Sequence, residues 1–102
     1  MMSIYMTAQW KCRPGAEGKV LAALEEFVAS IRGNEPHTRI YTALQHLDDP
    51  TAFLTYFIFD DLEGRDFHRS TAWVERFTEV IYPENAGEIE FTEYRLVAST
   101  DR

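Results

Sequence analysis

The sequence predicts an α+β fold in which helical segments cover one face of a small antiparallel sheet. Four segments show the alternation or the β-branched and aromatic content of strands, and the segments between them show apolar residues at helical spacing. No linker, repeat or low-complexity stretch divides the 102 residues, so we expect a single domain over residues 1–102. The resulting order β-α-β-β-α-β is that of the ferredoxin-like fold.

The first strand is predicted over residues 4–12, where apolar and polar side chains alternate. An Arg-Pro-Gly turn leads into a helix from Ala16 to about Arg32, whose apolar positions recur every three or four residues. Gly33 and Asn34 indicate the end of this helix, and Pro36 prevents its continuation.

A β-hairpin follows, with strands over residues 38–46 and 51–59 joined by a Leu-Asp-Asp-Pro turn. Its second strand is apolar on both faces, because side chains alternate along a strand. One face carries Phe53, Phe57 and Phe59, and the other carries Leu54, Tyr56 and Ile58. The helices can cover only one side of the sheet. We therefore expect the other side to pack against a second copy of the chain in a homodimer.

The second half of the chain is predicted to be helical before it returns to the sheet. An aspartate at residue 60 or 61 caps a short helix that continues to about residue 69. Ser70-Thr71 interrupts the pattern and caps a further helix, which Pro83 ends. The last strand is expected over residues 88–98.

Composition excludes several classes of partner. Ten basic and seventeen acidic side chains give a net charge of -7, which disfavours binding to nucleic acid or to anionic membranes. No apolar run approaches the ~20 residues of a transmembrane helix. The first residues lack the features of a signal peptide, and Cys12 is the only cysteine, so a reducing cytoplasm is the expected compartment.

No motif for a metal or nucleotide cofactor is visible. His37, His46 and His68 occur singly, without the spacing of H-E-x-x-H, and neither a glycine-rich phosphate loop nor a nucleophile elbow is present. We therefore expect no cofactor and no metal. Cys12 lies between two basic residues that would favour its thiolate, although a packed, unreactive thiol is the more common case.

Three segments together resemble the antibiotic biosynthesis monooxygenase family of dimeric α+β barrels. They are residues 10–18 (Trp-Lys-Cys-Arg-Pro-Gly-Ala-Glu-Gly), residues 41–53 (Tyr-Thr-Ala-Leu-Gln-His-Leu-Asp-Asp-Pro-Thr-Ala-Phe) and residues 67–70 (Phe-His-Arg-Ser). Many members have a second histidine shortly after the last motif, where this chain has Trp73 or its neighbour. The positions that the haem-degrading branch of the superfamily uses hold Ala8, Phe67 and Phe77 here, so haem degradation is not expected.

The resemblance points to His68 as the catalytic residue, because it matches the histidine of the family. A neutral imidazole can take a proton from a phenol and return it. The alternative is a histidine that only bonds the helix break at Ser70-Thr71. The expected walls of a substrate pocket are Tyr41, Tyr56, Trp73 and Phe77. These aromatic side chains can equally be plain core.

The expected function is a cofactor-independent monooxygenase that oxidises a small reduced aromatic, such as a quinol or an anthrone-like polyketide, with O₂. Arg39 or Arg65 is a candidate partner for an anionic substituent of the substrate. Two alternatives remain open: a cyclase or isomerase that uses the same histidine without O₂, and a non-catalytic dimer that binds small ligands or responds to stress.

Overall fold

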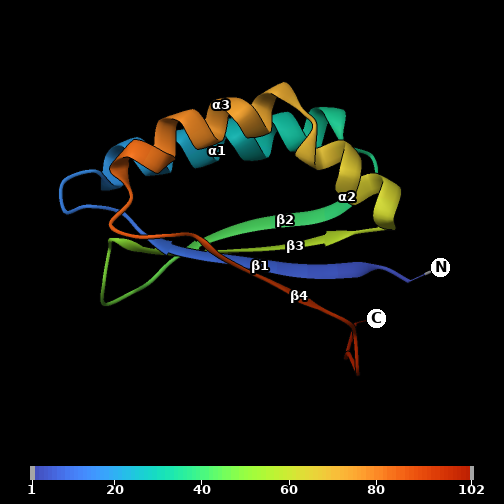
Figure 1. Cartoon of the computed structure of the whole chain (residues 1–102). Coiled ribbons are helices and arrows are strands. Elements are labelled where there is room, and N and C mark those ends of the chain that lie inside the picture. Colours follow the sequence, from blue (N-terminus) through green and yellow to red (C-terminus); the bar gives the residue numbers. More distant parts are fainter. Residues whose placement is uncertain (1, 102) are drawn as a thin grey trace.

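The computed structural model describes residues 2–101. Its elements are β1 (Ile4–Lys11), α1 (Glu17–Asn34), β2 (Thr38–Gln45), β3 (Ala52–Phe59), α2 (Leu62–Arg69), α3 (Ala72–Ile81), the 3₁₀ turn η1 (Tyr82–Glu84) and β4 (Glu90–Tyr94). The strands form one antiparallel sheet in the order β2-β3-β1-β4. The helices lie together over one face of this sheet (Figure 1). The predicted ferredoxin-like fold is confirmed, while the expected domain of residues 1–102 extends one residue beyond the described part at each end.

The core lies between the helices and the sheet. Helix α1 contributes a stripe of four buried side chains at intervals of three or four residues, and α3 contributes Phe77 and Ile81. The sheet meets them with the alternate residues of β1 and β3, among them Trp10 and Phe57. The ring of Phe27 from α1 stacks on the ring of Phe77 from α3, with their centroids 4.3 Å apart.

Helix α1 ends two residues later than the sequence indicated. Asn34 remains helical and donates a hydrogen bond from Nδ2 to the carbonyl of Ser30. The helix stops at Glu35, whose φ of -123° and ψ of 83° are non-helical, because Pro36 disfavours the α conformation in the residue before it. Gly33 and Asn34 therefore do not end the helix, and Pro36 does.

Strand β2 contains a β-bulge between Thr38 and Ile40. Thr38 lies opposite Phe59, but Ile40 lies opposite Ile58, so β2 has one extra residue at this point. The extra residue places both Thr38 and Tyr41 on the face that the helices cover, although the two are three residues apart. The strand predicted over residues 38–46 is therefore present, but its side chains do not alternate strictly at its beginning.

The connection from β3 into the helices is fixed by two side-chain caps. Asp61 accepts a hydrogen bond from the backbone N–H of Gly64 at the start of α2, and Thr71 accepts one from Val74 at the start of α3. The Thr71 hydroxyl also donates to the carbonyl of His68 at 2.9 Å. Of the two aspartates expected to cap the first helix, Asp61 is the one that does so.

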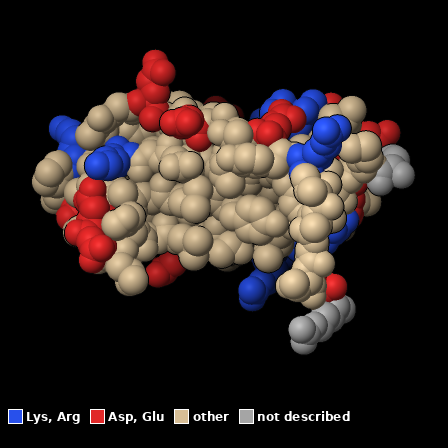
Figure 2. All heavy atoms as spheres, turned by 90° about the horizontal axis from the view of Figure 1, so that it is seen from below, with Lys and Arg blue, Asp and Glu red and all other residues tan. Residues whose placement is uncertain are grey.

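Within residues 2–101, no helix lies over the second face of the sheet (Figure 1). Strand pairing assigns to this face Tyr5, Thr7, Gln9, Ile40, Thr42, Leu44, Leu54, Tyr56, Ile58, Glu90, Thr92 and Tyr94. Figure 2, viewed onto this side, shows a broad uncharged surface across the middle of the molecule, with charged side chains towards its edges. Leu44 is 51% exposed and Ile40 41% exposed.

Strand β4 is shorter than the predicted residues 88–98. It covers Glu90–Tyr94, because Tyr94 already lies opposite Tyr5, one residue from the start of β1. Residues beyond Tyr94 have no strand alongside them to continue the ladder. Over residues 2–101, no helix has the length and apolar character needed to cross a membrane.

Candidate functional site

A buried acid–histidine pair joins the end of α1 to α2. Nδ1 of His68 lies 2.8 Å from Oε1 and 3.1 Å from Oε2 of Glu35. Both residues are buried, with 4% of Glu35 and 8% of His68 exposed. The pair forms because Pro36 turns the chain away from α1 at Glu35, while α2 presents His68 on its inner face.

Two further donors hold the carboxylate of Glu35. The Thr38 hydroxyl donates to Oε1 at 2.6 Å, and Nε1 of Trp73 donates to Oε2 in a short hydrogen bond. Burial by itself would raise the pKa of Glu35, but the hydrogen bonds from His68, Thr38 and Trp73 outweigh it and lower the pKa below its ordinary value. Glu35 is therefore ionised at neutral pH.

The charge of Glu35 determines which nitrogen of His68 carries the proton. An ionised carboxylate only accepts hydrogen bonds, so Nδ1 of His68 must be the donor. In a neutral imidazole, Nε2 is then the basic nitrogen. Among the described residues Nε2 has no hydrogen-bond partner. It is the atom that remains available to a molecule beside the ring.

His68 lines a cavity of about 340 Å³ between the helices and the sheet. Most of its wall is aromatic or aliphatic, with Phe27 and Phe77 from the helices and Phe57 and Trp10 from the sheet. The His68 ring lies in contact with Phe59, Phe27 and Tyr41, with centroids 5.2 to 5.9 Å apart. The volume falls within the range of small-molecule sites, and the apolar wall suits a flat aromatic ligand.

The structure brings together three of the five residues singled out in the sequence. Tyr41, Phe77 and His68 all line the cavity. Tyr56 does not, because it lies opposite Thr7 and Thr42 on the uncovered face of the sheet. Strand alternation separates it from Phe57, its neighbour in the chain.

Trp73 is also absent from the cavity wall, and its role differs from the one expected. It lies at the start of α3, where its indole N–H is bonded to Glu35 and its ring contacts Phe67 edge-on at 6.4 Å. Trp73 therefore positions the carboxylate that orients His68.

Tyr41 adds a hydroxyl to the cavity. Its phenol donates to Oγ1 of Thr55 at 3.5 Å, a long hydrogen bond, and its ring stacks on Phe57. Burial raises the pKa of Tyr41 well above its ordinary value of 10, so the phenol stays protonated at neutral pH. Tyr41 can donate a hydrogen bond but cannot act as a base.

The other candidates of the sequence lie away from the cavity. His46 accepts hydrogen bonds at Nδ1 from the backbone of Asp48 and Asp49, so it stabilises the hairpin turn. His37 is exposed and lies 3.6 Å from Asp60. Arg39 is also paired with Asp60.

Cys12 is a packed thiol. It is 1% exposed, and burial, together with the nearby carboxylates of Glu17, Asp49 and Glu84, raises its pKa above the ordinary value of 9. Its basic neighbours do not offset this effect, because Lys11 is paired with Asp49 and Arg13 with Glu84. Cys12 is therefore not a nucleophile at neutral pH.

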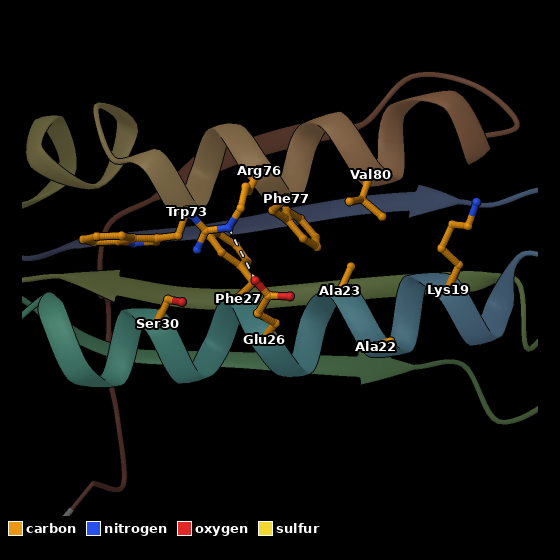
Figure 3. Close-up of a pocket in the computed structure, with 10 residues that line it drawn as sticks. All are labelled: Lys19, Ala22, Ala23, Glu26, Phe27, Ser30, Trp73, Arg76, Phe77 and Val80. Atoms are coloured by element: carbon orange, nitrogen blue, oxygen red, sulfur yellow. Dashed lines mark ion pairs between the residues drawn. The ribbon is translucent and has the colours of Figure 1, made fainter.

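A separate groove of about 260 Å³ lies outside the cavity, between α1 and α3 (Figure 3). The ion pair between Glu26 and Arg76 crosses it at 3.4 Å, and Trp73 lies at one end. Phe27 and Phe77 line both the groove and the inner cavity. One stacked pair of rings therefore lies between the cavity and this groove.

Glu35 is the member of the candidate site that the sequence did not reveal. It lies in the polar segment Gly33-Asn34-Glu35-Pro36, outside any apolar pattern and 33 positions from His68. A glutamate directly before a proline at a helix end is also typical of an ordinary solvent-exposed turn. The packing of α2, α3 and β2 around this turn makes Glu35 a buried partner.

The fold and this pair define an α+β protein with a buried acid–histidine pair beside an aromatic cavity. The chain belongs to the antibiotic biosynthesis monooxygenase family, whose model matches residues 3–80. The resemblance seen in the sequence is thus confirmed. A comparison with curated proteins gives no match.

Solved structures show the same fold at low sequence identity. A crystal structure of an antibiotic biosynthesis monooxygenase has a TM-score of 0.87 and 23% identity, covering 93% of this chain and 99% of the other. Rv0793 from Mycobacterium tuberculosis has a TM-score of 0.87 at 15% identity, covering 97% and 99%. A conserved protein from Methanosarcina mazei Go1 has a TM-score of 0.85 at 17% identity, covering 93% of each chain.

Proposed function

We propose that this protein is a cofactor-independent monooxygenase that oxidises a small reduced aromatic compound with O₂. The observation that supports this most is the Glu35–His68 pair beside an aromatic cavity, in a chain of the antibiotic biosynthesis monooxygenase family. The substrate class is a phenol with a readily oxidised ring, such as a quinol or an anthrone-like polyketide.

In the proposed reaction, Nε2 of His68 takes the hydroxyl proton of the bound phenol. Glu35 stabilises the imidazolium that forms, because its ionised carboxylate already accepts the Nδ1 proton. The apolar wall excludes water from the resulting phenolate and holds its ring in place.

The electron-rich anion supplies the electrons that reduce O₂. One electron passes from the anion to O₂, and the two radicals combine into a hydroperoxide at a ring carbon. When that carbon is a CH₂ group, loss of water from the hydroperoxide leaves a carbonyl, so R₂CH₂ and O₂ give R₂C=O and H₂O. The proton that His68 took from the phenol is the one that converts the first-formed peroxide anion into this hydroperoxide.

The proposed assembly is a homodimer in which the uncovered faces of two sheets pack together. This face is broad and uncharged apart from Glu90 near its edge, and it includes the exposed side chains of Ile40 and Leu44 (Figure 2). Leu44→Glu places a charge in the interface and should shift the sedimentation coefficient to that of a monomer. Leu47→Glu, on the turn and 99% exposed, is the matched control and should leave the dimer intact. A parent protein that sediments as a monomer at micromolar concentration contradicts the dimer.

The activity is tested by oxygen uptake with a panel of quinols and anthrones, using protein dialysed against a chelator. We expect His68→Ala to lower kcat/KM by about 10²- to 10⁴-fold, the usual contribution of a general base, and Glu35→Gln to lower it less. His37→Ala is the control, because this exposed histidine lies outside the cavity wall. Unchanged uptake in His68→Ala removes the histidine from the mechanism. Turnover that persists without oxygen identifies a cyclase or isomerase instead.

A further inference from the structure

The wall of the cavity carries one cationic side chain from the described residues. Among the described residues that line it, Arg69 is the only lysine or arginine, and Glu93 is the only carboxylate. Arg69 occupies the last position of α2, directly after His68, and its side chain is 53% exposed. The cation therefore lies where the apolar cavity meets solvent.

The guanidinium of Arg69 is only loosely held. Among residues 2–101 its one partner is Oε1 of Glu93, which lies 3.7 Å from Nη2, too far for a hydrogen bond. The same oxygen is approached by Nη1 of Arg65 at 3.4 Å, and Arg65 also pairs with Asp66. Arg69 thus shares a carboxylate with a second cation, and its N–H groups donate no hydrogen bond within the described part of the chain.

A free guanidinium at the rim of an apolar cavity matches a carboxylate on the ligand. Arginine presents parallel N–H groups that fit both oxygens of a carboxylate. The chain as a whole carries a net charge of -7 and repels anions, so an anionic group on the ligand needs a local cation of this kind.

We infer that the natural ligand is a hydroxylated aromatic carboxylate, whose ring fills the cavity and whose carboxylate pairs with Arg69. This inference rests on the proposed function, because it places the phenolic hydroxyl of the same ligand at His68. The two groups of the ligand would then meet consecutive residues of α2, both of which line the cavity. Arg69 is a specificity residue, and Glu93 is the anion that the ligand displaces.

The two side chains should have opposite effects on binding. Arg69→Gln removes the attraction and should weaken a carboxylate ligand by about 10- to 100-fold, the strength of a charge-assisted pair. Glu93→Gln removes the competing carboxylate and should tighten the same ligand several-fold. A purely structural role for the Arg69–Glu93 contact predicts loss of binding in both variants.

The test is isothermal titration calorimetry with 2-naphthol and 3-hydroxy-2-naphthoate, which differ by one carboxylate and require no turnover. The parent protein should prefer the naphthoate, Arg69→Gln should abolish the preference, and Glu93→Gln should increase it. Arg76→Gln is the matched control, because Arg76 is an exposed arginine that lines the outer groove and not the cavity.

Equal binding of the two probes by the parent protein, or an unchanged preference in Arg69→Gln, overturns this inference and leaves the proposed function in place. Binding of neither probe overturns both, because the cavity is then not a site for hydroxylated aromatics. Arg69→Lys provides a second variant, which should retain part of the preference through its charge alone.

Discussion

Gly64 lies directly against His37, so that a Cβ atom on Gly64 would come within 2.9 Å of the Cβ of His37 and 3.3 Å of its carbonyl oxygen. This close approach brings α2 onto the turn that carries Glu35. A side chain at position 64 would separate the two segments, and with them the two members of the acid–histidine pair.

We expect Gly64→Ala to destabilise the protein by about 1–3 kcal/mol, the usual cost of overpacking. Gly33→Ala is the control, because a Cβ at this helical position meets nothing within 4 Å and should stabilise by roughly 0.5–1 kcal/mol. Urea denaturation of both variants measures the difference. Equal stability of Gly64→Ala and the parent would show that α2 shifts freely.

The ionised state of Glu35 should make stability depend on acid pH. The pKa of Glu35 in the folded protein is lowered below 4.5, so on acidification the unfolded chain binds the proton at a higher pH than the folded protein does. The stabilisation is therefore fully present above pH 4.5, and it is lost as the pH falls through the pKa of the folded state. Glu35→Gln should lower the free energy of unfolding by about 1–3 kcal/mol at pH 7. The NH₂ group of the glutamine would face the hydrogen-bond donors that now surround the carboxylate. Denaturation curves from pH 7 to pH 3 should converge for the two proteins. Parallel curves would contradict an ionised Glu35.

Trp73→Phe should remove one hydrogen bond to the Glu35 carboxylate and leave the residues that line the cavity unchanged. Loss of the indole donor is expected to cost about 1–3 kcal/mol and to move the acid loss of stability to higher pH, since one hydrogen bond to the ionised form is gone. Trp10→Phe removes a buried indole whose N–H has no partner among the described residues. It should leave the pH profile unchanged even though it reduces stability.

Cys12 should resist modification while the protein is folded. Its burial and raised pKa predict that a disulfide reagent at pH 8 reacts at least about 100-fold more slowly with the native protein than with the protein in guanidinium chloride. Cys12 in Gly64→Ala should react faster than in the parent protein, because a lower free energy of unfolding raises the population of the open, reactive state. Immediate reaction of the native parent would show that the thiol is accessible.

The sequence was sufficient for the order of elements, because each strand and helix carries its own hydrophobic period. It also singled out His68, Tyr41 and Phe77, which lie together at the cavity. Glu35 was missed because its environment is created by a helix 33 residues further along the chain. Trp73 was expected to line the substrate pocket, because its place in the helical pattern indicates an inward-facing aromatic ring. The pattern gives no sign that its indole N–H bonds a buried glutamate.

The bulge in β2 means that residues cannot be deleted or inserted at the start of this strand without changing which side chains face the helices. Removal of one codon at Arg39 would restore strict alternation, so either Thr38 or Tyr41 would turn outward, and Glu35 or the cavity would lose a contact. The Leu-Asp-Asp-Pro turn a few residues later is an exposed connection of the kind that tolerates insertions. Libraries that vary loop length can therefore target this turn, while the start of β2 must keep its count of residues.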